Sequence, residues 1–310
     1  MSRMTWIFPA VVWLTVGCVN VARRNNDQVG HTCDYARPKT LLRWTSATDN
    51  PKSNDSNNAS GDAAENAADP PALDEIATDR PTFTPSSRAV GQGRVQLESG
   101  YTVTWSRANA ITPVMHSYPE AELRIGMFAD WFELRITQNI LSTLSPTRSD
   151  TGAADLLLGT RFWLTENYLF LPESSLIIQT TVPSGAEAFT SHKMLPGMLL
   201  VYSWTLVPDR VTLGGSSQAN AAVDGNRQSY LQLAQSLVLG YALTKKLGLF
   251  TECYALFPYG ETSTVPPQYN FDSGFTYKIT SNVQLDLRAG IGVNRSATDY
   301  FAGAGFAFRY

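Results

Sequence analysis

Charge, cysteine and histidine are scarce in this chain of 310 residues. Only 16% of the residues are charged, and 24 Lys and Arg nearly balance 27 Asp and Glu, which leaves a net charge of -3. Such a balance provides no basic surface for nucleic acid. The 22 glycines and the 43% hydrophobic content exclude a collagen-like or wholly disordered chain. No apolar run reaches the roughly 18 residues of a membrane helix, so the body of the chain is not a helical membrane protein.

The residues that usually bind metals or cofactors are few and far apart. The chain has three cysteines, Cys18, Cys33 and Cys253, and three histidines, His31, His116 and His192. This spacing forms neither a disulfide framework nor a zinc site. No phosphate-binding glycine motif stands between a strand and a helix. We therefore expect no metal and no cofactor.

The first 24 residues have the order of a secretory signal. Arg3 supplies a positive charge, residues 5–16 are almost entirely apolar, and Gly17 and Cys18 follow. The apolar stretch is too short to span a bilayer. Residues 14–18 also loosely resemble a bacterial lipoprotein signal, in which Cys18 would be lipidated after cleavage. Ordinary cleavage nearby is the alternative, and either process exports the chain.

Residues 25–80 predict a disordered, polar and acidic tether. The stretch 49–60 is nearly free of apolar side chains, and 61–71 adds acidic residues among Ala, Asn and Pro. Such a segment buries too little apolar area to offset an ordering entropy of roughly 1–2 kcal/mol per residue. His31 and Cys33 lie in this stretch, and we interpret them as unstructured rather than as ligands.

From residue 81 to the end, apolar and polar residues alternate with a period of two, which is typical of two-faced β-strands. In 95–105, one face carries Val95, Leu97 and Val103 and the other carries Gln96 and Glu98. The same pattern predicts twelve strands: 95–105, 120–128, 131–141, 154–164, 169–182, 195–207, 210–221, 230–242, 247–257, 269–279, 283–293 and 300–310.

Strand length and loop length favour a membrane barrel over a soluble sandwich. Many runs have about ten residues, the length that a tilted strand needs to cross a bilayer. Links after even-numbered strands are short, such as 129–130 and 208–209, whereas most links after odd strands are long, such as 106–119. Aromatic residues near strand ends would form the interfacial girdles. We therefore predict an all-β chain whose residues 81–310 form an antiparallel transmembrane β-barrel of about 12 strands.

The polar face of these strands carries charges that would line the lumen. They either pair and fill the lumen, or line a wet path that selects solutes. Three apolar residues, Leu157, Trp163 and Leu199, fall on the same face and could form an apolar pocket. The candidate lumen residues are Glu98, Glu122, Arg124, Glu133, Arg135, Asp155, Arg161, Glu252, Asp272, Lys278, Asp286, Arg288 and Arg309.

Six segments of the predicted barrel have a distinctive sequence: ATDRPTFT at 77–84, GRVQLESGY at 93–101, DLLLGTR at 155–161, VPSG at 182–185, DSGFTY at 272–277 and QLDLRAG at 284–290. These segments resemble the outer-membrane transporter family named after the meta-cleavage pathway of phenol degradation. The resemblance spans about 80–310, and Ser184 stands where that family usually has Thr. It implies a barrel that takes up small molecules, hydrophobic or aromatic ones included.

The last strand ends in Phe306, Phe308 and Tyr310, similar to the assembly signal of bacterial outer-membrane proteins. The expected partners are therefore the lipid bilayer, the barrel-assembly machinery and a small-molecule solute, and not nucleic acid. We expect a bacterial outer-membrane location with both termini periplasmic. Passive or facilitated transport is the predicted function.

Two rival functions remain open. A non-conducting structural barrel that displays its loops fits the same long links. A lipid hydrolase would need a Ser nucleophile and a His base. His116 and His192 fall in predicted outward loops, and we expect no enzyme.

Overall fold

The computed structural model describes residues 40–42, 75–106, 114–145, 148–260 and 265–310. The predicted signal at 1–24, the lipidation of Cys18 and most of the predicted tether lie outside these residues. Within the described ranges, no helix is long and apolar enough to cross a membrane. Regular structure is strand throughout these ranges.

In the described residues, thirteen strands form one antiparallel sheet. They are β1 (Val95–Trp105), β2 (Val114–Gly126), β3 (Phe132–Leu144), β4 (Ser149–Ala153), β5 (Leu156–Thr165), β6 (Glu173–Val182), β7 (Leu195–Val207), β8 (Val211–Val223), β9 (Ser229–Ala242), β10 (Leu247–Tyr259), β11 (Gln268–Thr280), β12 (Val283–Gly292) and β13 (Tyr300–Arg309).

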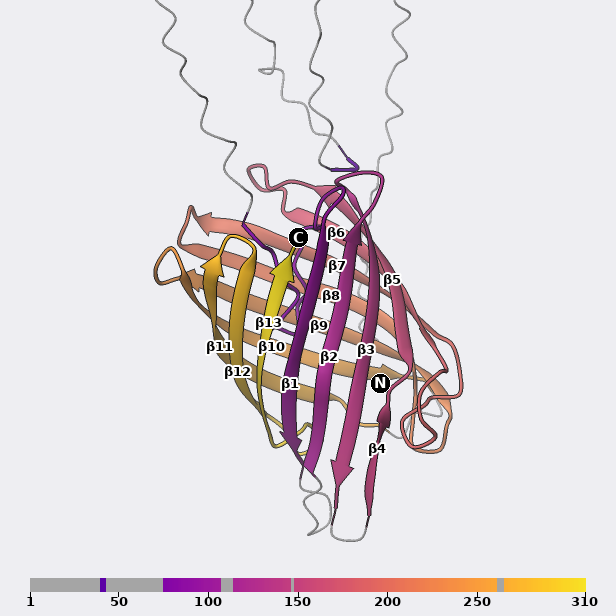
Figure 1. Ribbon diagram of the computed structural model, residues 1–310. Helices are drawn as coiled ribbons and strands as arrows, with labels where there is room; N and C mark the ends of the chain where they lie inside the picture. The colour runs from indigo at the N-terminus through magenta and orange to yellow at the C-terminus, as the bar shows by residue number, and fades with distance from the viewer. Residues whose placement is uncertain (1–39, 43–74, 107–113, 146–147, 261–264) are drawn as a thin grey trace, which may run out of the picture. The chain divides into compact units, whose positions relative to one another are not determined.

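The sheet closes on itself, because β1 pairs with β13 along its whole length, from Gln96 opposite Arg309 to Trp105 opposite Tyr300. The remaining strands pair with their neighbours in chain order, except that β4 pairs only with β3, beyond the β3–β5 ladder. Figure 1 shows these tilted strands side by side, with the C-terminus beside the start of β1. The prediction of a twelve-strand barrel is confirmed, with β4 as one additional short strand.

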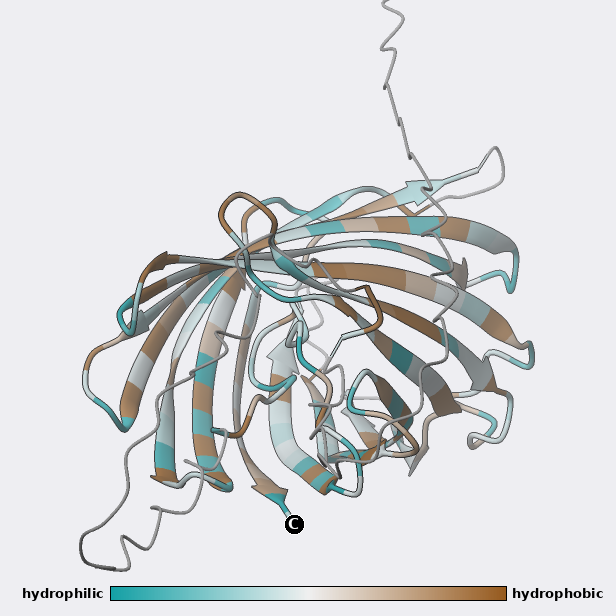
Figure 2. Ribbon diagram, turned by 90° about the horizontal axis from the view of Figure 1, so that it is seen from above, coloured by the Kyte–Doolittle hydropathy of each residue, from teal (hydrophilic) through white to brown (hydrophobic). Residues whose placement is uncertain are grey.

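Most apolar residues of the strands face outward. In β1, Leu97 and Tyr101 are each 39% exposed, whereas Gln96 and Glu98 are fully buried. The bands of hydrophobic and hydrophilic residues that alternate along the strands in Figure 2 follow from this period of two. An apolar outer face around a polar interior is the arrangement of a transmembrane β-barrel.

The links between strands differ in length between the two ends of the barrel. The end that holds the C-terminus has the links 127–131, 166–172, 208–210, 243–246 and 281–282, whereas the opposite end includes the longer links 183–194 and 260–267. This end with the C-terminus is called the short-link end below.

Two strands, β2 and β6, begin far from their predicted starts. The link 106–119 was expected to be a loop, but β2 already begins at Val114 and continues through Pro119. The ladders that β2 forms with β1 and β3 both shift register around this proline, because a residue without an N–H fits a strand best at a bulge. His116 therefore lies in a strand rather than in a loop. The strand expected from 169 begins at Glu173, because Tyr168 and Leu171 close a tight turn.

Candidate functional site in the barrel lumen

Residues 75–94, here called the plug segment, lie inside the barrel. Their partners come from strands all around the wall: Glu98 of β1, Arg161 of β5, Glu252 of β10 and Arg288 of β12. A segment that reaches all of these inward side chains must occupy the space that they enclose. The expected boundary between tether and barrel, at 80/81, falls within this segment.

Two buried glutamates hold the backbone of the plug segment. Glu98 accepts hydrogen bonds from the backbone N–H groups of Asp79, at 2.9 and 3.0 Å, and of Arg80, at 2.9 Å. Glu252 accepts from the backbone N–H groups of Phe83, at 2.6 Å, and Thr84, at 2.8 Å. A plug without regular structure leaves such N–H groups unpaired, so the wall carboxylates replace the missing backbone partners.

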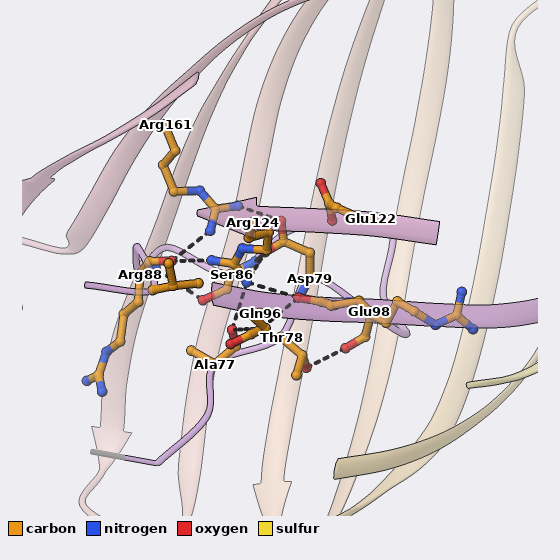
Figure 3. Close-up of polar contacts among 12 residues, drawn as sticks. Ala77, Thr78, Asp79, Ser86, Arg88, Gln96, Glu98, Glu122, Arg124 and Arg161 are labelled. Carbon is orange, nitrogen blue, oxygen red and sulfur yellow. Dashed lines mark hydrogen bonds and ion pairs between the residues drawn. The ribbon is translucent and has the colours of Figure 1, made fainter. Parts of the chain in front are cut away.

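A third anchor is the side chain of Asp79, which binds three arginines from the neighbouring strands β2, β3 and β5. Its Oδ1 lies 3.3 Å from Nη1 of Arg124, and its Oδ2 lies 2.6 Å from Nη2 of both Arg135 and Arg161. Figure 3 shows Asp79 beside Arg124 and Arg161. These three residues, Arg124, Arg135 and Arg161, are called the arginine trio below.

Burial alone would raise the pKa of Asp79, which belongs to the plug and to no strand. The charges of Arg124, Arg161 and Arg135 outweigh burial and hold this pKa below its ordinary value. Asp79 is therefore a carboxylate at neutral pH.

Arg124 joins the plug segment to the wall at several points. Its guanidinium is fully buried and donates to Glu98 at 3.0 Å and to Glu133 at 2.8 and 2.9 Å. It also donates to the backbone carbonyl groups of Ala77 and Arg88 in the plug, both at 2.8 Å. Every charge in this network has a partner of opposite sign, as burial in the lumen requires.

Arg80 of the plug segment lies against two glycines of the barrel wall, Gly100 and Gly305. Its guanidinium pairs with Glu120 and lies 3.4 Å from Asp286. A Cβ at Gly100 of β1 or Gly305 of β13 would overlap this guanidinium. A Cβ at either position would also lie 2.7 Å from a carbonyl oxygen of the neighbouring strand, so the close approach of Arg80 and of that strand together require glycine.

Further contacts fix both halves of the plug segment. The ring of Phe83 stacks on Tyr254 of β10, with centroids 4.3 Å apart. Arg288 donates to the carbonyl oxygen of Pro81 at 2.9 Å, and Arg88 pairs with Glu173 at 2.8 Å.

Asp272 of β11 differs from the other lumen carboxylates. It is fully buried and stands directly opposite Glu252 in the β10–β11 ladder, yet neither of its oxygens has a hydrogen-bond partner among the described residues. Glu252 holds the plug, whereas Asp272 does not.

Most of the predicted lumen residues therefore meet in one network around the plug segment, whereas Lys278 and Arg309 contact its first residue, Glu75, and Asp155 lies outside it. Lys278 pairs with Glu75 at the start of the plug. Arg309 bonds to Asn282 in a short link. Asp155, just before β5, accepts from Ser191 and Gly185 of the long link 183–194. The three C-terminal aromatic residues, Phe306, Phe308 and Tyr310, are exposed on the outer face.

The three apolar residues predicted to face inward differ in burial. Leu199 of β7 is 5% exposed and joins Ile177 and Val201 in a buried cluster, whereas Leu157 and Trp163 are only half-buried.

The lumen remains partly open at its short-link end. A cavity of about 750 Å³ lies there, and its lining includes Glu75, Arg210, Lys245, Lys246 and Lys278. Charges therefore pair around the plug segment, while space remains beside it.

Among the described residues, Ser191 and His192 are neighbours in sequence, but their side chains bond to different acidic residues. The Ser191 hydroxyl donates to Asp155, whereas the His192 ring lies 3.3 Å from Glu187. His116 accepts from or donates to Tyr101 at 2.7 Å. In the part of the chain that the structure describes, no three His, Cys, Asp or Glu residues are placed to hold a metal ion.

The geometry defines a class of protein: a twelve-strand outer-membrane-type barrel with a segment of its own chain inside. The sequence matches the model of the family described as "Putative MetA-pathway of phenol degradation" over residues 78–310. The chain belongs to this family, and the match includes most of the plug segment.

Among solved structures, an outer membrane channel from Pseudomonas putida F1 is similar, with a TM-score of 0.54 and 13% identity over 72% of this chain and 98% of that chain. The KdgM porin in complex with disordered oligogalacturonate is more distant, with a TM-score of 0.41 and 11% identity over 68% of this chain and 98% of that chain. The translocator domain of the autotransporter NalP from Neisseria meningitidis has a TM-score of 0.44 and 10% identity over 70% and 88%. No curated protein has a significantly similar sequence.

Proposed function

We propose that this protein is a bacterial outer-membrane channel through which small molecules pass by passive or facilitated diffusion. The observation that carries the proposal is the plug segment, which hydrogen bonds and ion pairs hold inside a closed, charge-lined barrel. A segment held by polar contacts can leave the lumen in an order-to-disorder transition and so open a path, a property that fits a gated channel better than a structural barrel. Hydrophobic or aromatic solutes are the class implied by the family.

The orientation that fits this function places both termini in the periplasm. The short links then face the periplasm and the long links face outward, the usual arrangement of outer-membrane barrels. Phe306, Phe308 and Tyr310 would serve the barrel-assembly machinery, for which their exposed outer-face positions are suitable.

Reconstitution of the full chain in planar bilayers tests the proposal. We expect brief conductance events that increase when contacts between plug and wall are weakened, and that change with the solute added. An electrically silent barrel, with every solute and every weakened plug, would support the rival function of loop display.

The enzyme alternative has less support, since the side chains of Ser191 and His192 bond to different acidic residues. Replacing His116 and His192 together should leave any lipid hydrolysis by the preparation unchanged.

A further inference from the structure

The arginine trio has more hydrogen-bond donors than the plug segment uses. Arg124 and Arg161 are fully buried and Arg135 is 9% exposed. Even with Asp79 bound, Nη1 of Arg135 and Nε of Arg161 have no acceptor among the described residues. Each guanidinium offers a planar fork that matches a carboxylate. The site therefore has the donors to bind a carboxylate larger or differently placed than that of Asp79.

The charge of the site is the same with Asp79 as with any other single carboxylate in its place. The wall supplies Glu98, Glu122 and Glu133 against the three arginines, so the wall alone is neutral there. Asp79 adds one further carboxylate from the plug segment. A second carboxylate in its place would leave the total charge of the site the same.

Arg161 depends most on Asp79. Besides the 2.6 Å contact with Asp79, the nearest carboxylate is Glu133 at 3.6 Å. If the plug segment leaves, this fully buried arginine loses its best partner, which is costly in a lumen unless another anion arrives.

We propose that the arginine trio is a binding site for the carboxylate group of a small organic acid, and that Asp79 occupies it in the closed barrel. The proposal rests on the proposed function and specifies a solute class for the same site. A solute carboxylate and the Asp79 carboxylate compete for the same donors, so solute binding favours release of the plug. Because Asp79 is tethered, its effective concentration is in the mM range, and a free acid must compete with that.

The test is calorimetric titration of the purified full-length protein in detergent at pH 7.5 with sodium benzoate, with benzyl alcohol as the uncharged counterpart. We expect Asp79→Ala to bind benzoate at least about tenfold more tightly than the wild type, since the competing carboxylate is gone. Adding Arg161→Met to Asp79→Ala should abolish this binding. Adding Arg227→Met instead, which removes an exposed arginine of the link 224–228 that pairs with Glu187, should preserve it.

Equal benzoate affinity in the wild type and Asp79→Ala would overturn the proposal, as would binding that survives Arg161→Met or that benzyl alcohol reproduces. Heat-modifiable migration in gels checks that each variant is folded. If Asp79→Ala does not assemble, Asp79→Asn keeps the side-chain shape, and a folded Asp79→Asn without any gain in affinity overturns the proposal equally. Since the titration needs no conduction, a silent barrel that binds benzoate contradicts only the transport function, and a conducting barrel that binds none contradicts only this site.

Discussion

Replacing Glu252 by Gln should open the barrel. Glu252 is 1% exposed, and its two oxygens accept from the backbone N–H groups of Phe83 and Thr84. The amide of Gln has only one acceptor oxygen, so its NH₂ group must face one of these donors. At least one charge-assisted hydrogen bond to the plug segment is lost, which is worth about 1.5–3 kcal/mol.

That loss converts to a shift of about 10- to 140-fold in the equilibrium between a seated and a displaced plug, because each 1.4 kcal/mol corresponds to a factor of ten. Single-channel recording in planar bilayers measures this shift as the open probability relative to the wild type. The size of the unitary conductance should change little, since the wall residue keeps its volume.

Asp272→Asn is the matched control. It converts the neighbouring buried carboxylate to an amide, directly opposite Glu252, without removing a hydrogen bond to the plug segment. We expect its open probability to stay within about twofold of the wild type. Equal effects of the two substitutions, or none from Glu252→Gln, would show that the plug is not held as described.

Three further predictions concern the plug and the outer face. Gly305→Ala places a Cβ where the Arg80 guanidinium lies, so the open probability in bilayers should rise although no charge changes. Leu287→Arg puts a charge on the 59% exposed outer face and should lower the unfolding free energy in lipid vesicles by about 2–4 kcal/mol if the residue lies near the midplane. The pKa of Asp79 is below its ordinary 3.8 when the plug is seated, so its contribution to closure is fully present above about pH 4 and is lost only as the pH falls through the lowered value. In recordings from pH 8 to pH 5, the open probability of the wild type should therefore show no pH-dependent rise that is missing in Asp79→Asn.

The barrel was predictable because a membrane strand has one lipid-facing and one lumen-facing side. The period of two in β1, for example, separates Leu97 from Glu98 and gives strand, face and approximate ends at once. The alternation is less informative at Pro119. Because proline has no N–H, it suggests that the strand starts after this residue, yet the ladder continues across it through a bulge. The alternation also misses the turn at 168–171, whose apolar residues look like the start of a strand.

The plug segment was not predictable from periodicity, since irregular chain has none. Its anchors, Asp79 and Arg80, fall at the end of a stretch whose composition is polar and acidic, and only their wall partners give them a fixed place. A signal was nevertheless present: the wall carries buried acids and bases that need partners, and the segment before β1 offers both charge signs next to each other. Which side chains meet across the lumen depends on barrel closure and stagger, which no single strand encodes.

Disulfide trapping of the plug segment tests the central claim most directly. The hydroxyl oxygens of Thr84 and Ser236 of β9 lie 2.6 Å apart, so cysteines at both positions should bridge. In the full chain carrying Thr84→Cys, Ser236→Cys and Cys253→Ser, oxidation should yield this cross-link, identified by peptide mass spectrometry, and abolish conductance until a reductant restores it. Absence of the cross-link, or an oxidised barrel that conducts as the reduced one does, would contradict a plug segment seated inside the lumen.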